Sequence, residues 1–128
     1  MSGLKPAKLI IAGSRDMVSS PYRMFTWDAV QIARELLQIE PSMVVCGMAT
    51  GIDRHGFDWA REGGIDVSEH HALWDKHGAA AGPVRNREMA QVADAALVIH
   101  NGSKGSMNMI RAARDMCKPV ISIRIDRF

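Results

Sequence analysis

Short apolar runs alternate with helical patterns five times along this chain of 128 residues, and this alternation constrains its fold more than any other feature. The predicted strands cover residues 8–12, 43–46, 65–67, 95–100 and 120–125. Strands separated by helices pair in parallel, because right-handed crossovers return the chain to the same sheet. We therefore predict one Rossmann-like α/β domain over residues 1–128, with three layers and about five parallel strands. Arg124 and Asp126 alternate with apolar residues in the last strand, which favours an edge position.

Helices are predicted between these strands from apolar stripes and from residues typical of helix ends. The first follows Ser19, carries Pro21 in its first turn and is closed by Pro41. The second has Asp53 in its first turn and ends at residues 63–64, which are both glycine. The other predicted helices cover residues 83–93 and 105–117, and a long loop is predicted at residues 70–82.

Small residues follow three of the predicted strands. The loops at residues 13–16, 47–53 and 101–106 are rich in Gly, Ser or Thr. In parallel sheets, ligands bind beyond the carboxyl ends of the strands, where these loops would meet. We therefore predict a ligand-binding site at this edge of the sheet. Its candidate ligand-binding residues are Gly13, Ser14, Arg15, Gly47, Thr50, Gly51, Asp53, Trp74, Arg85, Asn86, Gly102, Ser103, Gly105 and Ser106.

Residues 82–106 indicate what kind of ligand would bind there. They read as a helix, an apolar strand, a Gly/Ser loop and the start of another helix. The free N–H groups and the positive dipole end of such a helix attract phosphate, to which Arg85 would add a charge and Ser106 a hydroxyl. The pattern favours a phosphorylated nucleotide or a nucleotide-derived ligand. The alternatives are an ordinary serine-capped turn without a ligand, and a surface pair between Arg85 and Glu88.

Four segments resemble the SLOG superfamily of Rossmann-like nucleotide-binding domains. They read GSRD, CGMATGID, WDKHGAAAGPVRNREM and HNGSKGSMNMIRAA, and the similarity covers nearly the whole chain. The chain is similar to the YspA-type stand-alone branch, which is related to the Lonely Guy phosphoribohydrolases and to the DprA/Smf group. The resemblance implies a nucleotide-binding domain over residues 1–128. Lonely Guy enzymes cleave the N-glycosidic bond of nucleoside 5′-monophosphates.

The Lonely Guy motifs are matched only in part. Arg85 and Met89 match the Arg-Lys-x-x-Met run, but Asn86 replaces the lysine. Residues 101–106 match the phosphate loop approximately, and the glutamate of that motif falls on Met109. The resemblance therefore implies a retained phosphate site and an incomplete catalytic pair.

If the protein is an enzyme, another carboxylate must replace that glutamate. The candidates are Asp16, Asp53, Asp75 and Glu88. Because Asp53 lies on a predicted rim loop, Arg85 and Asp53 are the candidate catalytic residues of a nucleotide N-glycosidase. Asp53 could instead accept ribose hydroxyls, or stabilise the first turn of its helix through the dipole.

Three functions stay open. The first is a sensor or binding module for a nucleotide, which the missing glutamate favours. The second is hydrolysis of nucleoside 5′-monophosphates, and the third is handling of single-stranded DNA, as in another branch of the superfamily. A net charge of +2 and the lack of an aromatic and basic stripe argue against nucleic acid as the main partner. Relatives in the superfamily often pair, so a homo-oligomer also stays open.

Several other features have plainer interpretations. Cys46 and Cys117 lack a CxxC pattern and are interpreted as reduced packing thiols of a cytoplasmic protein. Trp74 could be a buried loop anchor rather than a platform for a base. A group of possible ligands, His70, His71, Asp75 and His77, matches no zinc signature. We therefore predict neither a metal site nor a cofactor, and no apolar run is long enough to span a membrane.

Overall fold

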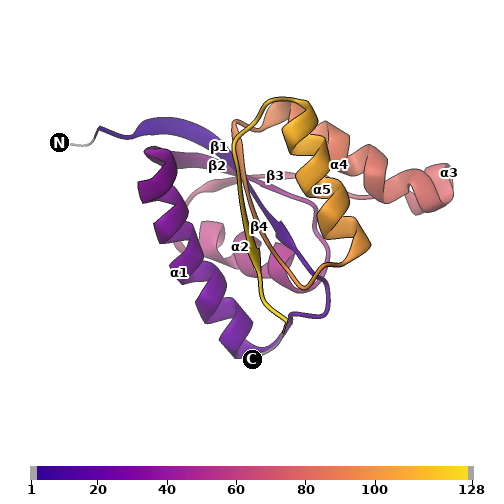
Figure 1. Cartoon of the computed structure of the whole chain (residues 1–128), viewed down its shortest axis with the longest axis horizontal. Helices are drawn as coiled ribbons and strands as arrows, with labels where there is room; N and C mark the ends of the chain where they lie inside the picture. The colour runs from indigo at the N-terminus through magenta and orange to yellow at the C-terminus, as the bar shows by residue number, and fades with distance from the viewer. Residues whose placement is uncertain (1–2, 127–128) are drawn as a thin grey trace.

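The sheet has five strands in the order β3-β2-β1-β4-β5 in the computed structural model, which describes residues 3–126 (Figure 1). The strands are β1 (Lys5–Gly13), β2 (Ile39–Cys46), β3 (Asp66–Glu69), β4 (Ala95–His100) and β5 (Val120–Arg124). Every neighbouring pair is parallel. The predicted Rossmann-like architecture and the edge position of the last strand are both confirmed.

Helices cover both faces of this sheet (Figure 1). They are α1 (Ser20–Leu37), α2 (Ile52–Glu62), α3 (Trp74–His77), α4 (Ala81–Val92) and α5 (Lys104–Asp115). Successive strand residues point to opposite faces, so Leu9 is buried in one core with Val30 of α1, and Ile10 in the other with Met89 of α4. The two cores give the three predicted layers. Among residues 3–126, no helix combines the length and the apolar character needed to cross a membrane.

The strand order places a crevice beside β1. From β1 the chain moves outward through β2 and β3 on one side, then crosses to β4 and β5 on the other. The direction of the crossovers therefore reverses between β1 and β4. Loops leaving the carboxyl ends of these two strands diverge, and such a switch point is where ligands bind in open parallel sheets.

Pro41 does not close the first helix, so that prediction is wrong. The helix ends at Leu37, because Gln38 adopts a left-handed conformation with φ 55° and donates its N–H to the Arg34 carbonyl. Pro41 lies inside β2, opposite Ala7 of β1. Proline has no N–H for a strand ladder, and the β1–β2 register shifts directly after Ala7.

Residues 70–82 are not a loop throughout, which corrects a second prediction. They contain α3 and a 3₁₀ turn, Gly78–Ala80, which runs directly into α4. The helix therefore begins at Ala81, two residues before Pro83. Proline is tolerated in a first helical turn, where its missing N–H would have no partner in the helix. This early start of the helical segment brings Trp74 next to α4.

Candidate functional site

A cavity of about 270 Å³ opens at the carboxyl edge of the sheet, beside the start of α5. We name it the inner cavity. The loops after β1, β2 and β4 line it together with α4 and α5. The predicted ligand-binding residues that line it are Gly13, Arg15, Asp53, Arg85, Asn86, Ser103, Gly105 and Ser106.

Hydroxyl groups connect the loop after β1 to the loop after β4. Ser14 Oγ donates to Asn101 Oδ1 at 2.9 Å and accepts from the Asn101 N–H at 3.1 Å. It also lies 3.1 Å from Ser103 Oγ, which in turn donates to Ser106 Oγ at 2.8 Å. Ser14 is buried and does not line the cavity, so it positions the residues that do.

The start of α5 keeps its first backbone N–H groups without a side-chain cap. Ser103 occupies the N-cap position, but its hydroxyl bonds to Ser106 rather than to a helix N–H. The first turn contains no acidic residue. The first N–H groups of a helix have no partner within the helix itself. Gly105 and Ser106 therefore give the inner cavity a positive helix end.

Arg85 reaches this cavity from α4. Its Nη1 donates to the Gly47 carbonyl at 2.6 Å and its Nε to Asn86 Oδ1 at 3.0 Å. These contacts, rather than a pair with Glu88, hold the guanidinium. Burial lowers the pKa of Arg85, while the nearby Asp53 carboxylate opposes that shift. Asn86, at the position of the motif lysine, in turn donates to Asn108 Oδ1 at 2.9 Å.

Asp53 joins two of the rim loops. Its side chain accepts from the Gly13 N–H at 3.3 Å and from the Ala49 N–H at 3.2 Å. The residue is only 4% exposed. Burial raises the pKa of this carboxyl, while the two backbone donors and Arg85 act in the opposite direction. The hydrogen bonds make Asp53 a clamp between the loops after β1 and β2, a role that its sequence position alone did not indicate.

Gly47 lies between the side chains of Asp53 and Arg85. A Cβ atom at Gly47 would lie 2.8 Å from Arg85 Nη1 and 2.8 Å from Asp53 Oδ2. Any side chain would therefore displace one of these groups. The glycine allows the two charged side chains to approach the same stretch of backbone.

A second cavity of about 410 Å³, the outer cavity, lies between the loop after β2 and α3. It shares Arg15, Ala49 and Arg85 with the inner cavity. Gly47, Thr50 and Trp74, all predicted ligand-binding residues, also line it. Trp74 is 49% exposed, so the interpretation of this residue as a buried loop anchor is wrong. The two cavities therefore have two arginines in common on their walls.

Two further predicted site residues lie outside both cavities. Gly51 has φ 76°, and a Cβ atom there would lie 2.2 Å from the Ser14 carbonyl oxygen, so the protein's own backbone requires this glycine. Gly102 donates its N–H to His100 Nδ1 at 3.0 Å and lies against the Arg124 guanidinium. Both residues shape the loops, and neither lines the inner or the outer cavity.

The inner cavity also contains residues that the list of candidate ligands omits. Asp16 and Asn101 line it, and Asn101 Nδ2 donates to both carboxylate oxygens of Asp16 at 3.2 Å. Met89 and Met109 add apolar surface. The sequence could have indicated these residues. Asp16 follows the first predicted strand, and Asn101, Met89 and Met109 fall within the segments that resemble the SLOG superfamily. Of the other candidate carboxylates, neither Asp75 nor Glu88 lines the inner cavity.

The two cysteines and the adjacent histidines His70 and His71 have separate surroundings. Burial and the Asp53 carboxylate raise the pKa of Cys46 to about 12, as expected for a packing thiol. Cys117 is exposed, so its interpretation as a packing residue is wrong. His70 and His71 bond separately to Ser68 and Glu69. Within residues 3–126, no group of three or more His, Cys, Asp or Glu side chains could hold a metal ion.

Comparison with known proteins shows a relative that is similar over most of this chain. The chain is 36% identical over 123 residues to the Gene 61 protein of Mycobacterium phage D29, across 90% of this chain and 94% of that protein. The chain belongs to the Gene 61 protein family. No model of a protein family matches its sequence.

The fold of this Gene 61 family member is shared with a bacterial protein. DNA processing protein A (DprA) from Streptococcus pneumoniae superposes with a TM-score of 0.71, over 92% of this chain. The two are 19% identical, so the likeness is one of fold, and the chain spans only 50% of the DprA chain. The likeness supports the Rossmann-like fold that the SLOG resemblance implied. The YspA-type branch stays a prediction.

Replacing Asp53 with Asn should change how stability depends on pH. Because burial raises the Asp53 pKa, the carboxyl keeps its proton to higher pH in the folded protein than in the unfolded chain. The free energy of unfolding should therefore fall as the pH rises from about 3.9 through the raised folded pKa. This part of the pH dependence should be missing in Asp53→Asn, as measured by urea unfolding.

Asp75→Asn, which changes an exposed carboxylate on α3, is the control and should keep that dependence. Identical pH profiles for Asp53→Asn and the unchanged protein would contradict the assignment of a buried, protonatable clamp at Asp53.

Proposed function

We propose that this Gene 61 family member binds a phosphorylated nucleotide or a nucleotide-derived small molecule at the carboxyl edge of its sheet, as a sensor or binding module. The observation that carries the proposal is the inner cavity. This cavity of about 270 Å³ is lined by the uncapped start of α5, by Ser106 and by Arg85. Helix N-termini with a nearby arginine bind phosphate strongly. Residues 1–128 would then act as one nucleotide-binding domain.

Each side of the inner cavity has a role in this proposal. The Gly105 and Ser106 N–H groups bind the phosphate, and Arg85 neutralises it. Asp16 accepts from the ribose hydroxyls, because its exposed carboxylate is held only by the Asn101 amide in the contacts described. Asp53 already accepts two backbone N–H groups, so we assign it to positioning the rim loops.

The arginine gives the first test. Nucleoside mono-, di- and triphosphates are screened by thermal shift against the unchanged protein, Arg85→Gln and Arg87→Gln. Arg87 is the matched control, because it lies two positions along the same helix and is exposed. A ligand at a hundred times its Kd should stabilise the protein by about 2.7 kcal/mol, and Arg85→Gln alone should lose most of this.

If no nucleotide stabilises the protein, or if both arginine variants behave alike, the proposal is wrong. For a ligand that binds, prolonged incubation followed by analysis for free base separates a binding module from an N-glycosidic hydrolase. With a nucleoside 5′-monophosphate, hydrolysis would add water across the bond between ribose C1′ and the base nitrogen, releasing free base and ribose 5-phosphate. Asp16→Asn and Asp53→Asn would then identify the carboxylate involved.

Gly105 gives a second test that separates binding from stability. A Cβ atom at Gly105 would meet nothing within 4 Å, so a side chain fits there. An aspartate in the first turn of α5 should preserve or raise the stability of the free protein, through the helix dipole and the lower backbone entropy of a residue other than glycine. Its charge should also repel phosphate, and nucleotide binding in Gly105→Asp should weaken at least about tenfold.

Isothermal titration and urea unfolding of the same samples measure the two effects, with Gly105→Ala as the uncharged control. Nucleotide binding that survives in Gly105→Asp would place the phosphate elsewhere.

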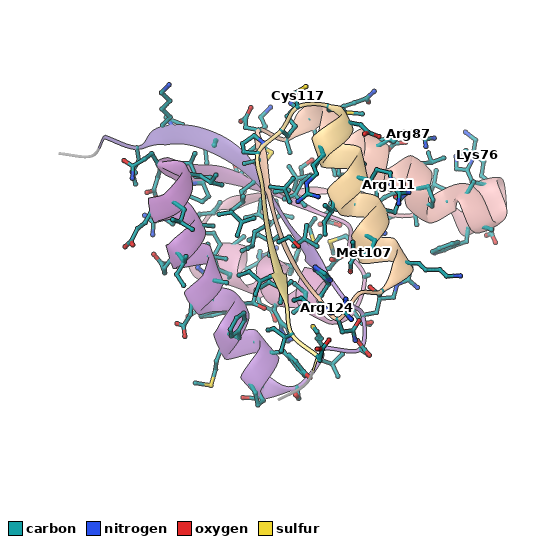
Figure 2. All side chains as sticks on the ribbon, in the orientation of Figure 1. Lys76, Arg87, Met107, Arg111, Cys117 and Arg124 are labelled. Carbon is teal, nitrogen blue, oxygen red and sulfur yellow. The ribbon has the colours of Figure 1, made fainter. Side chains whose placement is uncertain are left out.

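Handling of single-stranded DNA is the second candidate function. Pneumococcal DprA is named a DNA processing protein, and it shares this fold. Exposed basic side chains also occur on α4 and α5, and Figure 2 labels Arg87 and Arg111 among them. If these arginines contact DNA phosphates, the affinity for a single-stranded oligonucleotide should fall steeply with salt.

Fluorescence anisotropy of a labelled oligonucleotide at several salt concentrations tests this. The logarithm of the affinity should fall by about 0.7 per phosphate contact for each unit of log salt, and less steeply in Arg87→Gln/Arg111→Gln. Absence of binding at low salt would exclude this second function.

A further inference from the structure

The outer cavity has no role in phosphate or ribose binding as proposed above. It has a volume of about 410 Å³, and Trp74 is the aromatic residue on its wall. Half of this side chain is exposed, although it belongs to a segment that joins α4 without a loop. Leaving an indole in water loses the stabilisation that burial would give. An exposed, cavity-lining indole is therefore a candidate contact for a ligand.

The Trp74 ring is supported from two sides. Its Cη2 atom lies 3.7 Å from the place that a Cβ atom on Gly82 would take, so the ring edge rests on the start of α4. The Arg15 guanidinium carbon lies over the ring, 5.5 Å from its centroid. Thr50 Oγ1 donates to the Arg15 carbonyl at 3.1 Å and so fixes the backbone that carries this arginine. The ring is placed by packing and by a cation–π contact.

The linings of the two cavities share Arg15, Ala49 and Arg85. A ligand with its phosphate at the start of α5 would therefore reach Trp74 by extending past the two guanidinium groups. We propose that the outer cavity is the base subsite of the same ligand, with the base stacked on Trp74. This inference rests on the proposed function and narrows it: the ligand is a nucleotide with an aromatic base, and a sugar phosphate would bind only part of the site.

Stacking also determines how selective the subsite is. Every nucleobase presents a π-face, so a tryptophan and an arginine accept all of them with modest differences. His71, whose Nε2 lies 3.1 Å from Glu69 Oε1, is a polar group on the wall that could meet a base edge. A base should therefore raise the affinity of a ligand strongly, whereas the four bases should differ little in affinity.

A comparison of probes with and without a base tests the inference. Ribose 5-phosphate and the nucleoside monophosphates AMP, GMP, CMP and UMP share the sugar and the phosphate, and only the latter carry a base. In Trp74→Ala, affinity for the nucleotides should fall about tenfold or more, while affinity for ribose 5-phosphate should stay unchanged. Trp74→Phe, which keeps an aromatic ring, should retain most of the affinity.

Lys76→Ala is the matched control and should change neither. Lys76 is exposed on the same short helix, on the side of the molecule far from α1, and is absent from the lining of the outer cavity (Figure 2). Circular dichroism would check that each variant is folded.

Two results would overturn the base subsite and leave the proposed function standing. If Trp74→Ala weakens ribose 5-phosphate and the nucleotides equally, the ring positions the loop and contacts no base. If Trp74→Ala binds the nucleotides as the unchanged protein does, the base lies elsewhere. If the unchanged protein binds none of the five probes, and no nucleoside di- or triphosphate in the thermal-shift screen, the proposed function and this inference are both wrong.

Discussion

The candidate site depends on one buried carboxylate. Asp53 accepts from the Gly13 and Ala49 N–H groups, and so holds the loop after β1 against the loop after β2. Arg85 fixes the second loop from the opposite side through the Gly47 carbonyl. Two further bonds join the same segments, because the Ile52 N–H donates to the Ser14 carbonyl at 3.3 Å and Thr50 Oγ1 donates to the Arg15 carbonyl at 3.1 Å. The two backbone donors offset part of the desolvation cost of ionising this buried carboxylate, although burial still raises its pKa.

The electrostatics of the site follow from this clamp. Arg15 and Arg85 lie close enough to Asp53 for their charges to act on its pKa, and Asp16 is a second carboxylate on the lining of the inner cavity. The uncapped start of α5 adds further positive potential at the other end of the inner cavity. The two arginines and the two carboxylates balance formally, so the positive end of α5 is the feature that would attract the phosphate of a nucleotide.

The fold could be predicted from the sequence because strand and helix periods are local, and β4 with its following loop was placed correctly. Pro41 was misassigned, since proline signals a helix end in most contexts, and only the paired strand shows that the register shift accommodates it. The sequence predicted which loops form the site, but it did not predict the contacts that individual side chains make there. The clamp role of Asp53 depends on Gly13, which lies 40 residues away in the sequence. The position of Trp74 depends on packing against α4. No local sequence pattern contains either contact.

The central claim is that phosphate binds at the start of α5, and an amide-resolved NMR titration tests it most directly. ¹⁵N-labelled protein would be titrated with AMP while the backbone N–H signals of residues 3–126 are followed. The account predicts that the Gly105 and Ser106 signals shift most and saturate together, with smaller shifts in the loops after β1 and β2. Saturable shifts confined to another surface, or no shifts at millimolar AMP, would contradict it.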